Sequence, residues 1–128
     1  MASVLVVEDQ AENRDLMAYL LRAFGHDVTT AGNGAEGLEE ARRARPDLMV
    51  IDIQMPVMDG LELVAALKVD PALAPVPAVG VTAFAMVGDR DRILAAGFDG
   101  YISKPIDAMT FVGELEAFLA TDDRKSRE

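Results

Sequence analysis

Short apolar runs alternate with longer amphipathic stretches along this chain, and that alternation limits the folds open to it. Residues 3–7 are apolar and largely β-branched and end abruptly at two carboxylates, which is typical of a strand buried on both faces. Residues 11–24 carry apolar side chains at helical spacing and stop at Gly25. Both patterns recur along the sequence. We predict strands at residues 3–7, 26–30, 48–51, 76–81 and 99–102, and helices at residues 11–24, 35–45, 61–69, 85–96 and 107–119.

Strands that alternate with helices over a whole chain predict a parallel sheet with helices on both faces, joined by right-handed crossovers. Five such units fit an α/β fold of the flavodoxin-like, doubly wound class. The expected architecture is a five-stranded parallel sheet in the order 2-1-3-4-5 with five helices. Ligands bind these sheets beyond the carboxyl ends of the strands. We therefore expect the functional residues at those ends.

Size and charge exclude several classes of protein. The 128 residues suffice for one buried core and not for two, so we expect one domain over residues 1–120 and a polar, frayed tail over residues 121–128. A formal charge of −10 would repel nucleic acid. The chain has no cysteine and no apolar run near the ~20 residues that span a bilayer. We expect a cytoplasmic protein without nucleic-acid or membrane partners, and we interpret His26 as a surface turn residue.

Reactive side chains follow four of the five predicted strands, and the carboxyl ends of parallel strands meet at one edge of a sheet. Packed carboxylates repel one another unless a cation compensates. Oxygen ligands without cysteine favour a hard cation, and an incompletely filled shell favours Mg²⁺ over Ca²⁺. The sequence therefore predicts a magnesium site. The residues expected there are Glu8, Asp9, Asp52, Thr82 and Lys104.

A carboxylate beside a metal ion and an ammonium group can attack phosphorus and form an acyl phosphate. Asp52 stands alone at the end of the third strand, whereas Glu8 and Asp9 are adjacent and better placed to hold a metal ion. Taken singly, Glu8 and Asp9 could cap the first helix, and Asp52 could be a turn former. The combination favours phosphoryl transfer to Asp52.

Several motifs together resemble the receiver domains of bacterial two-component response regulators. The resemblance extends from Val4 to about Leu119. The motifs are Glu8-Asp9 after the first strand, Asp52-Ile-Gln-Met-Pro56 with Asp59-Gly60, Val81-Thr82-Ala83, and Tyr101-Ile-Ser-Lys104-Pro105.

The resemblance implies a metal site and a switch. Asp9 and Asp52 would bind Mg²⁺ directly, the backbone carbonyl of Gln54 would add a ligand, and Glu8 would act largely through water. The resemblance further implies that Thr82 and Lys104 bind phosphoryl oxygens.

The resemblance also implies how the signal leaves the site. Thr82 would move towards the phosphoryl group, and Tyr101 would turn inward behind it, which changes the face formed by the fourth helix, fifth strand and fifth helix. The peptide between Lys104 and Pro105 is expected to be cis, because X-Pro is the bond type for which that is cheap.

The implied partners are a histidine kinase or histidine phosphotransfer protein as phosphodonor and a downstream protein target. Asn13, Leu16 and Ile106 are candidate docking contacts for the donor, by their position near the site. Phe84, two residues after the switch threonine, could hinder water and slow the loss of phosphate. Catalysis would be limited to the protein's own phosphorylation and dephosphorylation, so we do not expect a conventional enzyme.

Other interpretations remain open. The chain could be a stand-alone regulator, or a receiver domain excised from a hybrid kinase or a larger regulator. An aspartate-nucleophile phosphatase would also use Mg²⁺ at a strand end, but it needs a second acid two residues after the nucleophile, where this chain has Gln54. A flavin-binding electron carrier is disfavoured by the three converging carboxylates.

Overall fold

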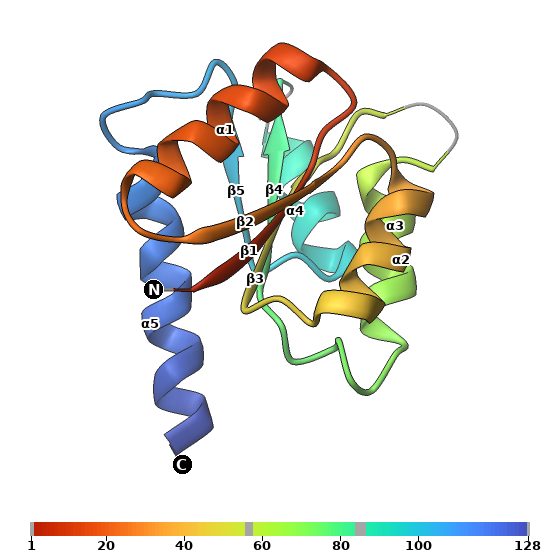
Figure 1. The fold of residues 1–128 in the computed structure, drawn as a ribbon. Coiled ribbons are helices and arrows are strands. Elements are labelled where there is room, and N and C mark those ends of the chain that lie inside the picture. Colours follow the sequence, from red (N-terminus) through yellow and green to blue (C-terminus); the bar gives the residue numbers. More distant parts are fainter. Residues whose placement is uncertain (1, 56–57, 84–86, 128) are drawn as a thin grey trace.

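Five parallel strands form one sheet in the order β2-β1-β3-β4-β5 (Figure 1), which confirms the predicted topology. The computed structural model describes residues 2–55, 58–83 and 87–127, with residues 87–89 and 120–127 described by their backbone alone. The strands are β1 (Ser3–Val7), β2 (Asp27–Ala31), β3 (Leu48–Asp52), β4 (Ala78–Thr82) and β5 (Gly100–Ser103). The helices are α1 (Ala11–Ala23), α2 (Gly34–Ala44), α3 (Gly60–Lys68), α4 (Val87–Ala96) and α5 (Phe111–Arg127).

The helices cover both faces of the sheet, and each face has its own apolar core. Val4 and Val6 of β1 pack on the face covered by α1 and α5. Leu5 and Val7 of the same strand pack on the opposite face, which is covered by α2, α3 and α4 (Figure 1). All residues of β3 and β4 are buried. Burial on both sides is why these strands are nearly continuous apolar runs instead of alternating ones.

Helix α5 differs from its predicted bounds at both ends. It begins at Phe111 and not at residue 107, because Asp107 forms a separate turn in which its side chain accepts a hydrogen bond from the backbone N–H of Met109, at 2.9 Å. The helix continues to Arg127, beyond the expected end at Leu119. No glycine or proline follows Gly113 to stop it. Among the described helices, α5 included, none is long and apolar enough to be a membrane span.

Strand β4 begins at Ala78, two residues later than predicted. The reason is Pro77, which has no backbone N–H to donate to a neighbouring strand. The carbonyl of Pro77 still accepts a hydrogen bond from Met49 on β3, at 2.9 Å. The shift does not move Thr82, which is the last residue of the strand as the site requires.

His26 is buried, and its interpretation as a surface turn residue is wrong. Its Nδ1 accepts a hydrogen bond from the backbone N–H of Ala2 at 3.2 Å, and its Nε2 lies 2.9 Å from a carboxylate oxygen of Glu116 on α5. The sequence around His26 resembles an exposed turn because both flanking residues are exposed. The imidazole instead joins the chain start to α5, at the end of the sheet opposite to Asp52.

Candidate functional site

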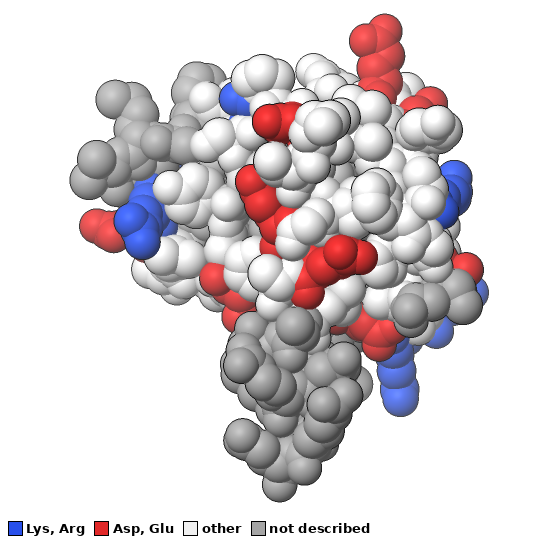
Figure 2. All heavy atoms as spheres, turned by 90° about the vertical axis from the view of Figure 1, so that its left-hand side faces the viewer, with Lys and Arg blue, Asp and Glu red and all other residues white. Residues whose placement is uncertain are grey.

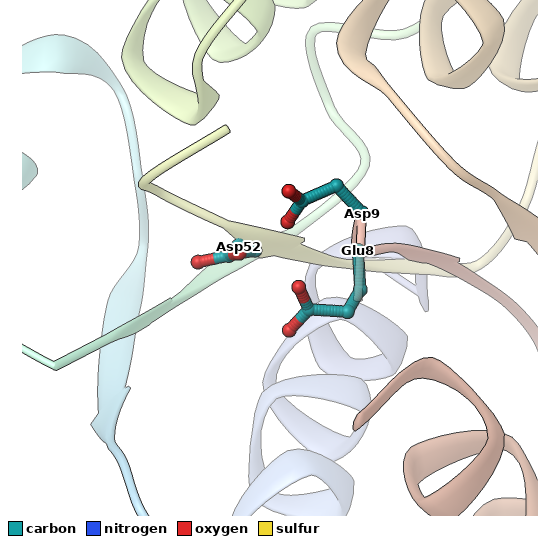
Figure 3. Close-up of side chains that lie close together, drawn as sticks. All are labelled: Glu8, Asp9 and Asp52. Atoms are coloured by element: carbon teal, nitrogen blue, oxygen red, sulfur yellow. The ribbon is translucent and has the colours of Figure 1, made fainter. Parts of the chain in front are cut away.

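Three carboxylates meet where β1 and β3 end. Glu8 and Asp9 directly follow β1, and Asp52 is the last residue of β3. In Figure 3, the side chains of Glu8 and Asp9 reach from the end of one strand to the side on which Asp52 lies. One oxygen from each carboxylate lies within 4.8 Å of the other two. Glu8 and Asp52 are buried and Asp9 is exposed, so the cluster has an inner and an outer side.

An ammonium group compensates the inner side of this cluster. Lys104 Nζ lies 3.2 Å from Glu8 Oε1 and 3.3 Å from Asp52 Oδ1. The backbone N–H of Lys104 donates to the carbonyl of Thr82 at 2.8 Å, which holds the lysine beside the end of β4. The peptide between Lys104 and Pro105 is cis, as predicted. The residue directly after β5 thus supplies the positive charge to a site whose carboxylates lie at the ends of β1 and β3.

The buried charges shift one another's protonation. Burial raises the pKa of Glu8 to about 7, and the neighbouring Asp52 carboxylate adds to that rise. The backbone N–H of Gln10 and the ammonium of Lys104 act in the opposite direction on the pKa of Glu8. Burial alone would lower the pKa of Lys104, but the carboxylates of Asp52 and Glu8 raise it above its ordinary value. Lys104 is therefore charged at neutral pH, where Glu8 still holds a proton part of the time.

The loop after β3 folds back tightly on Asp52. Gly60 donates its N–H to the carbonyl of Ile53 at 2.9 Å, and a Cβ added to Gly60 would lie 2.6 Å from the carbonyl oxygen of Asp52. Helix α3 begins here with a capping box, in which the side chains of Asp59 and Glu62 each accept a hydrogen bond from the other's backbone N–H. These contacts fix the backbone that carries Asp52.

Gln54 connects Asp52 to Thr82 across two strands. Its backbone N–H donates to Asp52 Oδ1 at 3.2 Å, and its side-chain amide donates to the hydroxyl of Thr82 at 3.4 Å. Thr82 is 1% exposed, so this hydroxyl lies in a restricted space beside the carboxylates. The family resemblance implied a role for the Gln54 backbone carbonyl and not for its side chain.

The donor set suits a hard divalent cation. Each of the clustered acids offers a carboxylate oxygen. Oε1 of Glu8 is buried and paired with the Lys104 ammonium at 3.2 Å, but it forms no hydrogen bond among the described residues. Mg²⁺ prefers oxygen ligands and keeps several of its waters instead of entering a closed protein cage. The exposed position of Asp9 gives such waters access from solvent.

Residues 4–116 match the response regulator receiver domain family. The chain belongs to this family. This receiver domain is 44% identical over 117 residues to the polar-differentiation response regulator DivK of Brucella anthropi, which covers 91% of the chain and 95% of DivK. The fold is similar to chemotaxis protein CheY4 of Vibrio cholerae, with a TM-score of 0.87, 32% identity and coverage of 91% of this chain and 98% of CheY4. NtrX of Brucella abortus has a TM-score of 0.91 and 27% identity, covering 98% of this chain and 28% of NtrX.

Membership of this family confirms the predicted function class. The protein is a two-component response regulator receiver domain, and these matches give no support to the phosphatase alternative. Receiver domains as a family bind Mg²⁺, take part in signalling with a phosphodonor kinase, and act on downstream targets. The acidic cluster of this receiver domain could hold such a metal ion.

The receiver domain brings together all five residues that were predicted to follow the strands at the magnesium site. The three proposed docking residues differ in exposure. Leu16 is 39% exposed on α1, and the side-chain amide of Asn13 donates to Gln10 at 2.9 Å. Ile106 is partly buried against the core on the side of α1 and α5. Phe84, named as a possible barrier to water, lies outside the described residues.

The sequence analysis missed one residue that contacts the site and one exposed apolar residue between β5 and α5. Arg14 Nη1 donates to the backbone carbonyl of Glu8 at 3.1 Å, and Met109 is 92% exposed in the segment between β5 and α5. Helical spacing could have indicated Arg14, because it lies in the first turns of α1, close behind Asp9. No sequence signal distinguished Met109 from a core methionine.

Proposed function

We propose that this receiver domain accepts a phosphoryl group on Asp52 from the phosphohistidine of a kinase or phosphotransfer protein. The observation that carries the proposal is the position of the Asp52 carboxylate, 3.3 Å from the Lys104 ammonium within a cluster of three acids. An isolated buried acid would not need an ammonium group within a cluster of other acids. A carboxylate that must carry an additional anionic group does need one, because the ammonium balances the added negative charge.

The transfer is a displacement at phosphorus. A carboxylate oxygen of Asp52 forms the new P–O bond while the P–N bond to the donor histidine breaks, and the imidazole leaves and takes up a proton. Lys104 and Thr82 bind the oxygens of the transferred group. Hydrolysis of the acyl phosphate by water then returns the Asp52 carboxylate and inorganic phosphate. The protein acts only on itself in both steps, which is why we do not class it as a conventional enzyme.

We assign the metal site to Asp9, Asp52 and the backbone carbonyl of Gln54, with Glu8 contributing through water. The bound Mg²⁺ supplies positive charge that offsets the charge of the phosphoryl oxygens. Glu8 suits an indirect role because its carboxylate is buried and already lies 3.2 Å from Lys104. Asp9 suits direct contact because it is exposed.

Phosphorylation would act on the rest of the molecule through Thr82. Its hydroxyl accepts a hydrogen bond from the Gln54 side chain, and a phosphoryl group on Asp52 offers it new acceptor oxygens. Movement of Thr82 towards them would free space that Tyr101 enters from β5. Tyr101 already packs partly against the core. The face that changes is formed by α4, β5 and α5.

The phosphodonor would dock beside the site, on the first turns of α1 and the segment after β5. Leu16 offers exposed apolar surface on α1, Asn13 lies in the first turn of the same helix, and Ile106 follows the peptide of Lys104, which contacts Asp52. The exposed Met109 extends the apolar part of this surface. We propose this region as the contact for the kinase or phosphotransfer protein.

Phosphorylation of the whole chain by a small acyl or amido phosphate tests the proposal. With Mg²⁺ present, intact-mass measurement should find one added phosphoryl group, located on Asp52 by fragmentation. Asp52→Asn should abolish the added mass, and the matched change Asp27→Asn, at an exposed acid on β2, should leave it unchanged. Phosphate added elsewhere, or retained in Asp52→Asn, would contradict the assignment.

A further inference from the structure

Arg14 reaches from helix α1 to the backbone between Glu8 and Asp9. Its guanidinium donates a hydrogen bond from Nη1 to the carbonyl of Glu8 at 3.1 Å, and Arg14 is half-buried. A Cβ built at Gly32 would lie 3.5 Å from the same nitrogen, so the guanidinium also lies close to the turn that follows β2. The side chain of Arg14 is therefore placed where two neighbouring strands end.

The carbonyl that Arg14 binds belongs to the peptide group that connects Glu8 to Asp9. Because a peptide group is planar, fixing the orientation of the Glu8 carbonyl also fixes the N–H and the Cα of Asp9. The N–H of Glu8 donates to the carbonyl of Ala31 on β2 at 3.0 Å, which is the last contact between β1 and β2. Arg14 thus holds the chain directly after the point where pairing within the sheet ceases.

The carboxylates of Glu8 and Asp9 are held to different degrees. That of Glu8 is bound by the ammonium of Lys104 and by the backbone N–H of Gln10, which lies 3.2 Å from Oε2. The carboxylate of Asp9 forms no hydrogen bond or ion pair with any residue that the structure describes. Its direction therefore depends on the backbone that carries it, and Arg14 fixes that backbone.

We infer that Arg14 is a positioning residue for the metal site, which orients the peptide group before Asp9 so that the Asp9 carboxylate lies beside that of Asp52. This inference rests on the proposed function, which assigns Asp9 as a direct ligand of Mg²⁺. An arginine suits the task because its guanidinium stays charged in proteins, and a hydrogen bond from a charged donor is stronger than a neutral one.

A general effect of charge predicts the opposite result for loss of Arg14. The chain has a formal charge of −10, and Figure 2 shows acidic side chains down the middle of one face, with basic side chains mainly at its margins. Loss of any arginine makes the protein more negative, which by itself attracts a divalent cation more strongly. Weaker Mg²⁺ binding without Arg14 would therefore report the lost position of Asp9 and not the lost charge.

Titration of the whole chain with MgCl₂, followed by calorimetry or amide NMR, tests the inference. Arg14→Met keeps an unbranched side chain and removes the donor. Its dissociation constant for Mg²⁺ should rise about tenfold, because groups that orient metal ligands commonly change metal affinity by that much or more. Arg14→Lys keeps a charged donor and should recover part of the affinity.

Arg22 provides the matched control. It lies on the same helix, and its Nη2 donates to the backbone carbonyl of Val28 on β2 at 3.0 Å. Arg22→Met therefore removes the same charge and the same kind of hydrogen bond without touching the peptide group before Asp9. Its affinity for Mg²⁺ should equal that of the native chain or be slightly higher.

The rate of phosphorylation by a small acyl phosphate separates positioning from a direct part in the chemistry. In Arg14→Met the rate should be low at limiting Mg²⁺ and approach the native rate at saturating Mg²⁺, because the bound ion then holds Asp9 in place. A rate that stayed low at every Mg²⁺ concentration would contradict a role in positioning alone.

Two further results would overturn the inference. These are Mg²⁺ binding in Arg14→Met that is unchanged or tighter, and equal weakening of Mg²⁺ binding in Arg14→Met and Arg22→Met. The native chain distinguishes these results from failure of the proposed function. If the native chain binds no Mg²⁺ and gains no phosphoryl group on Asp52, the proposed function fails and the role of Arg14 fails with it.

Discussion

The Glu8 carboxylate shows how burial and neighbouring charge set the behaviour of a single residue in this site. Its side chain is fully buried, and its ion-pair partner Lys104 is shared with Asp52. Burial raises the pKa of Glu8 to about 7, well above the usual value of an acid. Glu8 therefore changes protonation state near neutral pH, and a nearby metal ion must compete with that proton.

Magnesium affinity should rise with pH between about 6 and 8. Below its raised pKa, Glu8 is protonated in the metal-free protein, and binding of a cation must expel that proton. The dissociation constant should fall by up to about tenfold per pH unit and level off above pH 8. Titration with Mg²⁺ at a series of pH values, monitored by NMR or calorimetry, measures this slope.

Two variants identify the group responsible for the slope. Glu8→Gln should give a Mg²⁺ affinity that is nearly independent of pH across this range. His26→Gln removes the one histidine of the chain and should leave the slope intact. A slope that persisted in Glu8→Gln, or one that vanished in His26→Gln, would show that another group is responsible.

The sequence could predict which residues of the site come together, but not how they are bonded. A parallel sheet brings strand ends to one edge, so Glu8, Asp52 and Lys104 follow from strand order alone. The shared ammonium, the 3.4 Å contact from the Gln54 side chain to Thr82 and the Arg14 contact depend on side-chain rotamers. The apolar pattern and the spacing of residues in the sequence do not determine side-chain rotamers.

At the scale of elements, the bounds of a strand or helix were predicted correctly where burial between two layers requires an apolar run. They were predicted wrongly where a local hydrogen bond determines at which residue the element begins. Strand β1 has its predicted bounds because its whole apolar run is needed between two helical layers. Helix α5 does not, because the Asp107 turn delays its start by hydrogen bonding to the backbone. His26 was misplaced for a related reason, since its partners, Ala2 and Glu116, are distant in sequence.

Two glycine-to-alanine changes should have opposite effects on stability. Gly60→Ala places a Cβ 2.6 Å from the Asp52 carbonyl oxygen, so the end of β3 must shift, at a cost of about 1–3 kcal/mol in the free energy of unfolding. In Gly113→Ala the added Cβ meets no atom within 4 Å, and α5 should gain about 0.5–1 kcal/mol because alanine favours a helix over glycine.

Urea denaturation measures both changes, and phosphorylation separates their functional effects. Gly60→Ala should also slow phosphorylation by a small acyl phosphate, because the displaced backbone carries Asp52. Gly113→Ala should phosphorylate at the normal rate. Normal stability and phosphorylation in Gly60→Ala would show that the close contact after β3 does not hold the site.

At the scale of the whole molecule, the acidic site is a region of self-repulsion in a chain of charge −10. Lys104 offsets part of the charge of Glu8 and Asp52, whereas Asp9 stands on the exposed side of the cluster. Stability in the metal-free state is therefore reduced by the same carboxylates that would bind the ion. The fold tolerates that cost because the site lies at the carboxyl ends of the strands, where Asp9 is exposed to solvent and Lys104 supplies an opposite charge.

Magnesium should stabilise the whole fold through this site. A ligand that binds only the folded state adds about 2.7 kcal/mol at one hundred times its dissociation constant. For a domain of this size that corresponds to a rise in Tm of roughly 10 °C. Asp9→Asn should be more stable than the native chain without metal, because one of three like charges is gone, yet should gain little from Mg²⁺. NaCl at matched ionic strength is the control, since it screens charge without occupying the site. If NaCl raised Tm as much as MgCl₂ did, or if Asp9→Asn kept the full gain, the effect would be general screening and not binding at the cluster.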